Sequence, residues 1–526
     1  MLMLAACGLD NTAPTVPATS AGTTLFEVTE ASIAGLQAAL TGGAVSCSEI
    51  VSAYLARIEA YDQTSGLNAI SMVHPGALDA ARALDARLAA GAPVGSLFCV
   101  PMLIKDNFDT YDLPTTGGSI TLRDSVPPDD AWMVRRLREA DAIILAKTNM
   151  AEWAFSPRRT ESSTRGVTAN AYALDRVPAG SSGGTASAVA ASFGAAGLGS
   201  DTGNSIRGPA SHLALFGIRA TLGLISRDGI IPLAFDRDVG GPLTRTVADA
   251  ARLLNVLTGY DPADPLTELS RNRPQEDYTR YLDAGALAGA RIGVLRALTD
   301  VPDADPEVLA RFEAALADLR RAGAELVDPL VIDDLEAHLH ANNFCPRFRY
   351  DMRGYLQSLG DGAPFVDVLE ALEIGRHSDY VRPNLEFFAQ HALDVAPDDW
   401  ESPCPTFPDH PGRQAFRASV LTAMDAAAVE VIVYPTWNNP PALLARAEED
   451  YRGDNSQLVA PATGMPAASV PMGFVDPALP VGLQILARPF DEAAIFRIAY
   501  GYEQLTAHRL PPAGFPPLVQ EQSDIE

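Results

Sequence analysis

Apolar residues follow two distinct patterns along this chain of 526 residues. Helical spacing of apolar positions predicts helices over residues 29–40, 46–60, 75–90, 244–258 and 306–322, with Thr29 or Glu30 at the cap of the first. Continuous apolar runs predict strands over residues 97–104, 142–147, 291–295, 429–434 and 467–486. Because strands and helices alternate over the whole length, the pattern predicts an α/β fold with a central mixed, mostly twisted β-sheet and helices on both of its faces.

No long linker divides these elements, so residues 26–514 are expected to form a single large domain. Residues 1–25 have the character of a truncated lipoprotein-like signal and a flexible tether, and residues 515–526 are assigned to a C-terminal tail. Residues 330–415 are helical in pattern and rich in phenylalanine and tyrosine. We expect this region and the loop 155–168 to line a substrate pocket.

The first residues bear on localisation. Residues 4–7, Leu-Ala-Ala-Cys, resemble the processing box of a bacterial lipoprotein, although the positive charges that normally precede such a box are missing. If the box is genuine, a lipid on Cys7 anchors the protein in the bacterial cell envelope; otherwise the protein is expected to be cytoplasmic. The other four cysteines do not define a disulfide framework in so long a chain, and Cys99 is assigned to a core strand.

Composition excludes several classes of function. The formal net charge of −27 opposes nucleic-acid binding. The longest apolar stretch, residues 186–199, is too short to span a bilayer. The eight histidines show no metal-ligand spacing, so neither a metal site nor a cofactor is expected. The expected partner is a small-molecule substrate, and the chain is expected to be a monomer or a homodimer.

Lysine usage points to a catalytic group. The chain has 39 basic residues, of which only Lys105 and Lys147 are lysines. Arginine stays protonated at any working pH, whereas a lysine can lose its proton and act as a base. Lys105 ends the apolar run 97–104, which makes it a candidate general base; the alternative is a lysine whose amine merely reaches solvent at a strand end. Lys147 also ends a strand, and we expect it to serve packing or hydrogen bonding.

Two glycine-rich motifs supply candidate nucleophiles. The first, Gly-Ser-Ser-Gly-Gly at 180–184, places the hydroxyls of Ser181 and Ser182 at a helix N-terminus. The second, Asp-Thr-Gly-Asn-Ser at 201–205, can turn several backbone N–H groups inward, with Gly203 able to adopt a positive φ and Asn204 tolerating one. Such a nest would hold an oxyanion on the N–H groups of Thr202, Gly203, Asn204 and Ser205 while the hydroxyl of Ser205 attacks. The alternative is a glycine-rich turn that binds phosphate.

A serine nucleophile needs a base, and neither motif contains a histidine. A neutral Lys105 at pH 7 requires a pKa lowered by roughly 3 from its ordinary value, and burial beside a helix N-terminus acts in that direction. A second serine could relay the proton between Lys105 and Ser205. Ser181 has the right position in the sequence for this relay, and Ser182 is its rival.

These motifs together resemble the amidase signature family of serine hydrolases. The resemblance rests on Gly-Ser-Ser-Gly-Gly, on Asp-x-Gly-x-Ser-Ile-Arg-x-Pro-Ala and on Val-Pro-x-x-x-Lys-Asp, and it covers residues 26–510. It implies the amidase signature fold and a triad in which Ser205 is acylated, Lys105 is the base and Ser181, after a non-proline cis peptide bond, is the relay. Supporting roles fall to Ser182, Asp201 and Arg207, of which Arg207 is expected to hold the nucleophile loop.

Three positions depart from the family pattern. Asn204 stands where the family has glycine, Gly208 stands where a bulky residue is common, and Ala179 stands where glycine precedes Gly180. None of the changed side chains touches a predicted catalytic atom. We therefore expect them to affect substrate preference rather than activity.

The function expected from the resemblance is hydrolysis of linear carboxylic amides through an acyl-enzyme, with esters and carbamates as further substrates. One alternative is the glutaminase subunit of a transfer-RNA amidotransferase, which shares the triad. The acidic composition, the lipoprotein-like start and the aromatic region 330–415 weigh against it. Another alternative is a catalytically inactive binding protein of the envelope, against which the intact triad counts.

Overall fold

A computed structural model of the chain describes residues 26–341 and 344–518. The expected signal and tether, with the candidate lipid anchor Cys7, lie outside the described residues, as do residues 519–526 of the expected tail. The start of that tail packs onto the body of the protein: Phe515 is buried, and the buried Arg57 donates hydrogen bonds to the carbonyl oxygens of Phe515 and Pro516.

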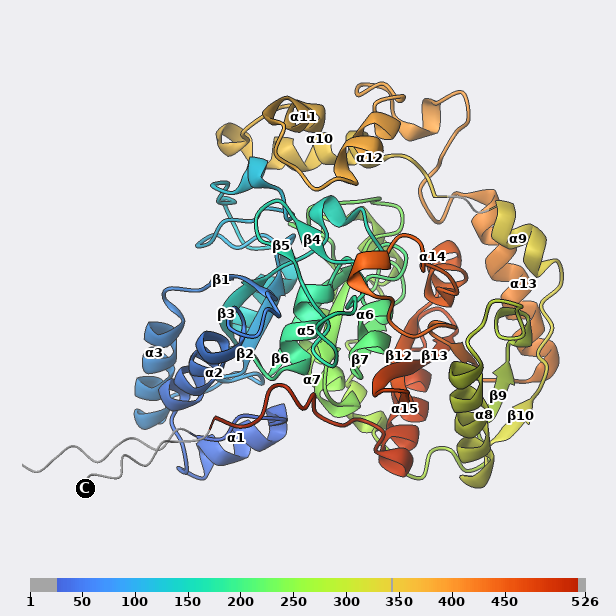
Figure 1. Cartoon of the computed structure of the whole chain (residues 1–526), viewed down its shortest axis with the longest axis horizontal. Helices are drawn as coiled ribbons and strands as arrows, with labels where there is room; N and C mark the ends of the chain where they lie inside the picture. Colours follow the sequence, from blue (N-terminus) through green and yellow to red (C-terminus); the bar gives the residue numbers. More distant parts are fainter. Residues whose placement is uncertain (1–25, 342–343, 519–526) are drawn as a thin grey trace, which may run out of the picture.

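The core of the molecule is a mixed sheet of 11 strands in the order β1-β3-β2-β6-β8-β7-β12-β13-β11-β9-β10 (Figure 1). The strands are β1 (Ile70–Val73), β2 (Pro101–Lys105), β3 (Ile143–Thr148), β6 (Ala196–Asp201), β7 (Phe216–Arg219), β8 (Val239–Thr244), β9 (Arg291–Val294), β10 (Glu325–Val327), β11 (Val431–Pro435), β12 (Ala467–Val475) and β13 (Leu479–Ala487). Strand β2 lies between its parallel neighbours β3 and β6, and every residue of these three strands is buried. Parallel strands buried along their whole length need cover on both faces. A separate two-stranded sheet pairs β4 (Glu161–Ser162) with β5 (Gly166–Val167).

Helices flank the sheet, which confirms the predicted α/β architecture. They are α1 (Ile33–Thr41), α2 (Cys47–Tyr61), α3 (Ala77–Ala89), α4 (Trp132–Glu139), α5 (Gly183–Ala190), α6 (Arg207–His212), α7 (Val247–Leu257), α8 (Pro306–Arg321), α9 (Leu335–Ala341), α10 (Phe348–Ser358), α11 (Ala371–Ile374), α12 (Val381–Phe388), α13 (Pro411–Ala427), α14 (Ala460–Thr463) and α15 (Glu492–Thr506). Helix α5 packs on β2 and β6, α6 packs on β12 and β13, and α15 packs on the same two strands and on α7 and α8. No helix in the described ranges is long and apolar enough to cross a membrane.

Several of the predicted boundaries are wrong. The stretch predicted as strand over residues 467–486 forms the two strands β12 and β13. The first helix begins at Ile33, capped by the hydroxyl of Ser32 rather than by Thr29 or Glu30, because Ser32 accepts a hydrogen bond from the N–H of Gly35. The strand predicted over residues 97–104 begins only at Pro101. Cys99, assigned to that strand, lies in the preceding turn with φ of 55°.

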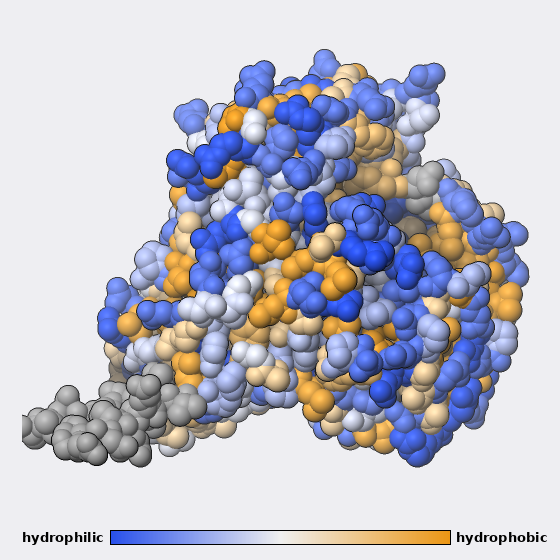
Figure 2. Space-filling model, in the orientation of Figure 1, coloured by the Kyte–Doolittle hydropathy of each residue, from blue (hydrophilic) through white to orange (hydrophobic). Residues whose placement is uncertain are grey.

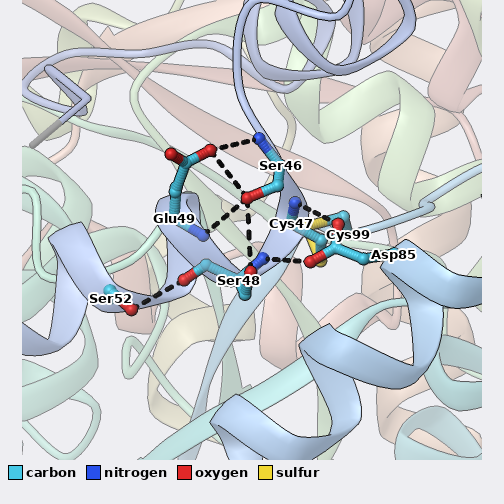
Figure 3. The surroundings of a disulfide bond; sticks show 7 residues. All are labelled: Ser46, Cys47, Ser48, Glu49, Ser52, Asp85 and Cys99. Carbon is cyan, nitrogen blue, oxygen red and sulfur yellow. Dashed lines mark hydrogen bonds between the residues drawn. A yellow bond between two sulfur atoms is a disulfide. The ribbon is translucent and has the colours of Figure 1, made fainter. Parts of the chain in front are cut away.

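Cys99 has a second role that the sequence does not reveal. It forms a disulfide with Cys47 at the start of α2, and Cys345 pairs with Cys404. Figure 3 shows the first of these bonds beside Asp85 of α3, whose carboxylate accepts hydrogen bonds from the N–H groups of Cys47 and Ser48. A capping box between Ser46 and Glu49 closes the same helix end. The disulfide therefore ties the start of α2 to the turn that leads into β2.

Helices α10, α11 and α12, from the second part of the region 330–415, build a lobe that lies apart from the sheet at the top of Figure 1, whereas α9 of the same region lies beside α13 and packs on it. The lobe has its own apolar cluster, in which Phe348, Met352 and Phe388 are buried. Trp153 and Ile231 belong to the same cluster and come from loops beyond the carboxyl ends of the central strands. This contact fixes the lobe over the edge of the sheet where the candidate site lies.

Candidate active site

The candidate residues meet at the carboxyl ends of parallel strands. Lys105 is the last residue of β2, and Ser200 and Asp201 are the last residues of β6, which pairs with β2 in parallel register. Ser181 precedes the N-terminus of α5, the helix that runs back to β6. Parallel strands present their carboxyl ends at one edge of a sheet, so three sequence-distant segments deliver polar groups to one place.

The Lys105 amine is fully buried and has three oxygen neighbours. Its Nζ lies 2.7 Å from Ser181 Oγ, 2.8 Å from Ser200 Oγ and 3.3 Å from the Ser200 carbonyl oxygen. Burial lowers the pKa of Lys105 to about 7, although the charges of Asp201 and Asp238 act in the opposite direction. Near neutral pH a large share of Lys105 is therefore uncharged.

The arrangement suits a neutral amine. An uncharged Nζ has two N–H groups and one lone pair. The two N–H groups can donate to the oxygens of Ser200, leaving the lone pair to accept the proton of Ser181 Oγ. Ser200 Oγ also accepts a hydrogen bond from Asn107 Nδ2 at 3.0 Å. Ser200 Oγ thus acts as an acceptor toward both Asn107 and the Lys105 amine.

The two serines of the first motif take different positions. The Gly180–Ser181 peptide bond is cis, as the resemblance implies, and Ser181 is fully buried against Lys105. Ser182 is also fully buried, but its hydroxyl donates to the carbonyl oxygen of Ser200 at 3.2 Å rather than to the amine. Ser181, not its rival Ser182, contacts the amine of Lys105.

Ser205 lies at the wall of a cavity. It follows β6 in the loop that leads into α6, it is 6% exposed, and it lines the cavity described below. Its Oγ donates to Oδ1 of the neighbouring Asn204 at 3.4 Å. Among the described residues no hydrogen bond joins Ser181 Oγ to Ser205 Oγ. The structure thus brings Lys105 and Ser181 into hydrogen-bond contact. No direct hydrogen bond between the described residues links this pair to Ser205.

The loop 202–205 differs from expectation in its backbone. Neither Gly203 nor Asn204 has a positive φ, so the predicted left-handed nest is wrong. In the described part of the chain, the backbone N–H groups of Gly203, Asn204 and Ser205 donate to no protein acceptor. A Cβ at Gly203 would lie 2.7 Å from Gln457 Oε1, so a larger residue there would have to displace the end of the Gln457 side chain.

A buried ion cluster holds this loop. Asp201 accepts hydrogen bonds from the guanidinium groups of Arg207 and Arg219 and from the N–H of Ile206. Arg207 also donates to the carbonyl oxygen of Gly203 at 2.6 Å. Burial alone would raise the pKa of Asp201, but the two arginines hold it below its ordinary value. Arg207 thus bonds to the loop it was expected to hold.

Several further polar residues were missed by the sequence reasoning, namely Ser200, Asn107, Arg219 and Asp238. Asp238 accepts the hydroxyl of Thr202 and the N–H groups of Leu233 and Ala234, and burial raises its pKa to about 6. The position of Ser200 could have been predicted, because it directly precedes the motif residue Asp201 at the carboxyl end of a strand that pairs in parallel with β2. The others come from separate segments, and no local pattern marks them.

Two of the departures from the family pattern are coupled in space. A Cβ at Gly208 would lie 2.9 Å from Nδ2 of Asn204 and 3.2 Å from the ring of Trp437. The side chain of Asn204 thus occupies space that a larger residue 208 would need. At the third departure, Ala179 has φ of 61°, a conformation that glycine adopts more readily.

Lys147 holds a loop. Its buried Nζ donates to the carbonyl oxygen of Phe108 at 2.6 Å and to Thr115 Oγ1 at 2.9 Å, and it lies 3.7 Å from Asp106. None of its hydrogen bonds reaches Ser181 or Ser205. These contacts fit the expected structural role.

A cavity of about 390 Å³ opens beside Ser205. It is lined by Ala154, Phe155, Pro157, Thr202, Gly203, Asn204, Ser205, Leu233, Arg237, Leu339, Phe344, Asn384, Phe387, Phe388, Gln457 and Leu458. The phenylalanines of this lining come from the segments expected to form the pocket, whereas Phe348 and Tyr355 of the same lobe pack in its core instead. Figure 2 shows apolar residues gathered where the surface is hollowed between the α10–α12 lobe and the body.

Comparisons with known proteins identify relatives in sequence and in overall fold. A family model described as Amidase matches residues 49–496. A glutamyl-tRNA(Gln) amidotransferase subunit of Thermosynechococcus vestitus is 35% identical over 88% of this chain and 95% of its own. The native peptide amidase of Stenotrophomonas maltophilia superposes with a TM-score of 0.81 at 33% identity, covering 92% of this chain and 98% of its own. The glutamyl-tRNA(Gln) amidotransferase subunit of Thermotoga maritima superposes with a TM-score of 0.67 at 27% identity, covering 87% and 91%.

The coupling of Asn204 with Gly208 gives a testable double substitution. Gly208→Ala alone should destabilise the protein by about 1–3 kcal/mol, because the new methyl group meets Asn204 Nδ2. Asn204→Gly in the same chain should restore part of that loss and admit larger substrates beside Ser205. Thermal unfolding of the two single variants and the double variant measures the coupling. Strictly additive losses would contradict it.

Proposed function

Because the chain belongs to the amidase family, we propose that it is a serine hydrolase that cleaves linear carboxylic amides through an acyl-enzyme on Ser205. The observation that carries the proposal is the 2.7 Å contact between the buried Lys105 amine and Ser181 Oγ. Ser205 lines a cavity that could receive a substrate. The amine supplies the base that a serine nucleophile requires.

In the proposed first step Ser205 Oγ attacks the amide carbonyl. Its proton passes to Ser181 Oγ while the proton of Ser181 passes to Lys105 Nζ. This exchange requires the Ser205 side chain to rotate from Asn204 toward Ser181. The negative charge on the carbonyl oxygen is held by the backbone N–H groups of Thr202, Gly203, Asn204 and Ser205, which lie ahead of the α6 N-terminus.

In the second step the charged Lys105 returns its proton, through Ser181, to the leaving nitrogen, and the C–N bond breaks. Amides depend on this step more than esters do, because an amide anion is a very poor leaving group. Water then attacks the acyl-enzyme and gives a proton to Lys105 through Ser181. That proton returns through Ser181 to Ser205 Oγ as the bond between Oγ and the acyl carbon breaks, which releases the carboxylic acid and restores the free enzyme. Esters and carbamates could pass through the same steps.

A second candidate function is that of a glutaminase subunit of a tRNA amidotransferase. The name of the Thermosynechococcus vestitus relative favours it. The free-standing amidase is favoured by the closer superposition with the peptide amidase, 0.81 against 0.67, and by the aromatic residues that line the cavity. A panel of peptide amides, anilides and L-glutamine given to the purified chain alone separates the two. Preferential release of ammonia from L-glutamine would favour the second.

We also propose that the protein works in an oxidising compartment, as the envelope would provide. The support is the pairing of all four described cysteines in two disulfides, because disulfides persist in oxidising compartments and are rare in the cytosol.

Substitution of the nucleophile is the first test. Ser205→Ala should lower turnover of an anilide or peptide amide by roughly 10³-fold or more and abolish labelling by a fluorophosphonate, with unfolding temperature retained. Ser71→Ala, which removes a buried hydroxyl without a hydrogen-bond partner among the described residues, is the matched control and should change neither. Labelling that persists in Ser205→Ala would place the nucleophile elsewhere.

Substitution of the base gives a pH signature. As pH rises through about 7, Lys105 loses its proton and kcat/KM should rise to a plateau. Lys105→Ala should remove that limb and lower amide turnover by roughly 10²–10⁴-fold, and it should lower ester turnover less. Lys147→Met, the matched control at the other lysine, should keep the limb. Equal losses on amide and ester, or an unchanged limb in Lys105→Ala, would refute the assignment.

The compartment proposal predicts the redox state of the cysteines. Denatured protein purified without reductant should expose no thiol from Cys47, Cys99, Cys345 or Cys404, and reduction should add four. Removal of the first disulfide as Cys47→Ala with Cys99→Ala should cost up to about 4 kcal/mol of stability, because it frees a long loop in the unfolded chain. The double variant Cys345→Ala with Cys404→Ala measures in the same way how much the second disulfide contributes to stability. Four free thiols before reduction would argue against the proposal.

A further inference from the structure

The side chain of Gln457 lies against the loop 202–205, and the proposed mechanism gives it no role. Gln457 is half-buried and lines the same cavity as Gly203 and Ser205. A Cβ at Gly203 would lie 2.7 Å from Gln457 Oε1 and 3.3 Å from Gln457 Cδ. The carboxamide of Gln457 therefore packs on the α-carbon of a residue that belongs to the same loop as Ser205.

Arg207 fixes the position of Gln457 relative to this loop. Its Nη2 donates to the carbonyl oxygen of Gly203 at 2.6 Å, and its Nη1 donates to the carbonyl oxygen of Ser456 at 2.8 Å. Ser456 directly precedes Gln457, and Arg207 is fully buried. Because the guanidinium is a rigid planar fork, these two bonds hold the segment that carries Gln457 and the loop that carries Ser205 in one relative position.

The contacts of Gln457 Nε2 determine which way the carboxamide points. Nε2 donates to the hydroxyl oxygen of Tyr451 and, at 3.1 Å, to Asp454 Oδ2. The Tyr451 hydroxyl in turn donates to Asp454 Oδ2 at 3.2 Å, so its oxygen is available as an acceptor. Burial raises the pKa of Asp454 to about 6, which leaves this carboxylate largely ionised at neutral pH and able only to accept. A carboxamide turned the other way would set Oε1 against the carboxylate, so Oε1 is the atom directed away from it.

Gln457 Oε1 is therefore an acceptor that lacks a donor within the described part of the chain. Both hydrogens of Nε2 are used, whereas no described residue donates a hydrogen bond to Oε1. The carboxamide lies on Gly203 at the wall of the cavity. A ligand that displaces water from an acceptor and offers no donor leaves it unpaired, at a cost in free energy. The oxygen thus favours an occupant that carries a donor at this point.

We propose that Gln457 Oε1 accepts a hydrogen bond from a substrate N–H group within two bonds of the scissile carbonyl carbon, and that the enzyme thereby selects substrates with such a donor. This inference rests on the proposed amide hydrolysis and adds a substrate feature to it. In that mechanism the carbonyl oxygen is held by the N–H groups of the loop 202–205, on which the Gln457 carboxamide packs, so the substrate atoms nearest the carbonyl carbon come closest to Oε1. Two N–H groups fit this description: that of the leaving nitrogen and that of an acylamino group on the α-carbon.

A purely structural role for Gln457 makes a different prediction. Its bonds to Tyr451 and Asp454 could simply support the loop 202–205 from behind. Loss of that support would displace Ser205 and lower kcat/KM for every substrate by a similar factor. Loss of an acceptor for a substrate N–H would lower kcat/KM only for substrates that carry this N–H. The ratios of kcat/KM values among matched substrates therefore separate the two roles.

Four chromogenic substrates of closely similar shape distinguish the two N–H groups. N-acetyl-L-phenylalanine 4-nitroanilide carries both of them. O-acetyl-L-phenyllactic acid 4-nitroanilide keeps only the leaving N–H, and N-acetyl-L-phenylalanine 4-nitrophenyl ester keeps only the acylamino N–H. The 4-nitrophenyl ester of O-acetyl-L-phenyllactic acid has neither. Their common benzyl group is chosen because phenylalanines contribute to the lining of the cavity.

Gln457→Met keeps the length of the side chain and removes the oxygen acceptor. Relative to the wild type, it should lower kcat/KM by roughly 5–50-fold for the substrates that carry the recognised N–H and leave those without it within about twofold. A loss confined to the two anilides would identify the leaving N–H, and a loss confined to the two N-acetyl substrates would identify the acylamino N–H. An equal loss on all four substrates would overturn the proposal.

The pH profile separates the proposed contact from damage to the proton relay. A disturbed relay would also penalise the anilides more than the esters, but it would shift the rising limb of kcat/KM that Lys105 sets near pH 7. Gln457→Met should keep that limb where the wild type has it. A selective loss on the anilides together with a shifted limb would count against the proposal.

Two further variants serve as controls. Tyr451→Phe leaves Gln457 in place and removes one acceptor of Nε2, so it should give a smaller loss on the same substrates. Asn384→Leu removes another carboxamide from the lining of the same cavity. Whatever Asn384→Leu does to the overall rates, it should leave the ratios among the four substrates unchanged; a change of ratios like that of Gln457→Met would contradict a specific role for Gln457.

A binding measurement keeps this test independent of turnover. In the Ser205→Ala background, calorimetry with the four compounds should show that added Gln457→Met weakens binding of those that carry the recognised N–H and not of the others. If the wild type hydrolyses no amide, the proposed function fails, while the selective change in binding still decides the role of Gln457. If the anilides are hydrolysed and neither turnover nor binding changes selectively, only the Gln457 inference fails.

Discussion

Burial of the Lys105 amine at the carboxyl end of β2 is the constraint on which the rest of the site depends. A charged ammonium in that position would lose its hydration, and this cost lowers its pKa to about 7. The Ser181 and Ser200 oxygens offer hydrogen bonds that suit a neutral amine. The fold thus converts a residue that is ordinarily a solvated cation into a group able to exchange protons near neutral pH.

That burial is possible because the surrounding charges are paired among themselves. Asp201 is flanked by Arg207 and Arg219, and Asp236 bonds to Arg413, all of them buried. Breaking a buried ion pair by removing one partner leaves an uncompensated charge, at a cost of about 3–5 kcal/mol. The cluster around Asp201 also fixes the nucleophile loop, since Arg207 bonds both to Asp201 and to Gly203. The same buried ion pairs that balance the interior charges therefore also hold the loop that carries Ser205.

The candidate triad and the wall of the cavity come from different parts of the molecule. Lys105, Ser181 and Ser205 belong to β2, the α5 N-terminus and the loop after β6, which the central sheet positions. The cavity wall comes from the region 330–415, from Phe155 and Pro157, and from the loop that bears Arg237. In the proposed mechanism, substitutions in the lobe would alter which amide is cleaved without disturbing the proposed proton relay. Such a division fits the observation that similar folds occur in relatives named for different activities, such as a peptide amidase and a tRNA amidotransferase subunit.

The sequence by itself determined the fold class and the identity of the candidate triad. Apolar periodicity is a local property, and Lys105, Ser181 and Ser205 each sit in a short motif whose glycines and neighbours mark it. It did not determine the helix cap at Ser32, the start of β2 at Pro101 or the disulfide of Cys99, because each depends on a neighbour in space. Only the tertiary structure decided that Ser181 rather than Ser182 contacts the amine. It alone placed Ser200 against the amine and Arg237 in the cavity. The physical reason is common to these cases: strand pairing and burial bring together groups far apart in the chain, and no spacing along the sequence encodes that proximity.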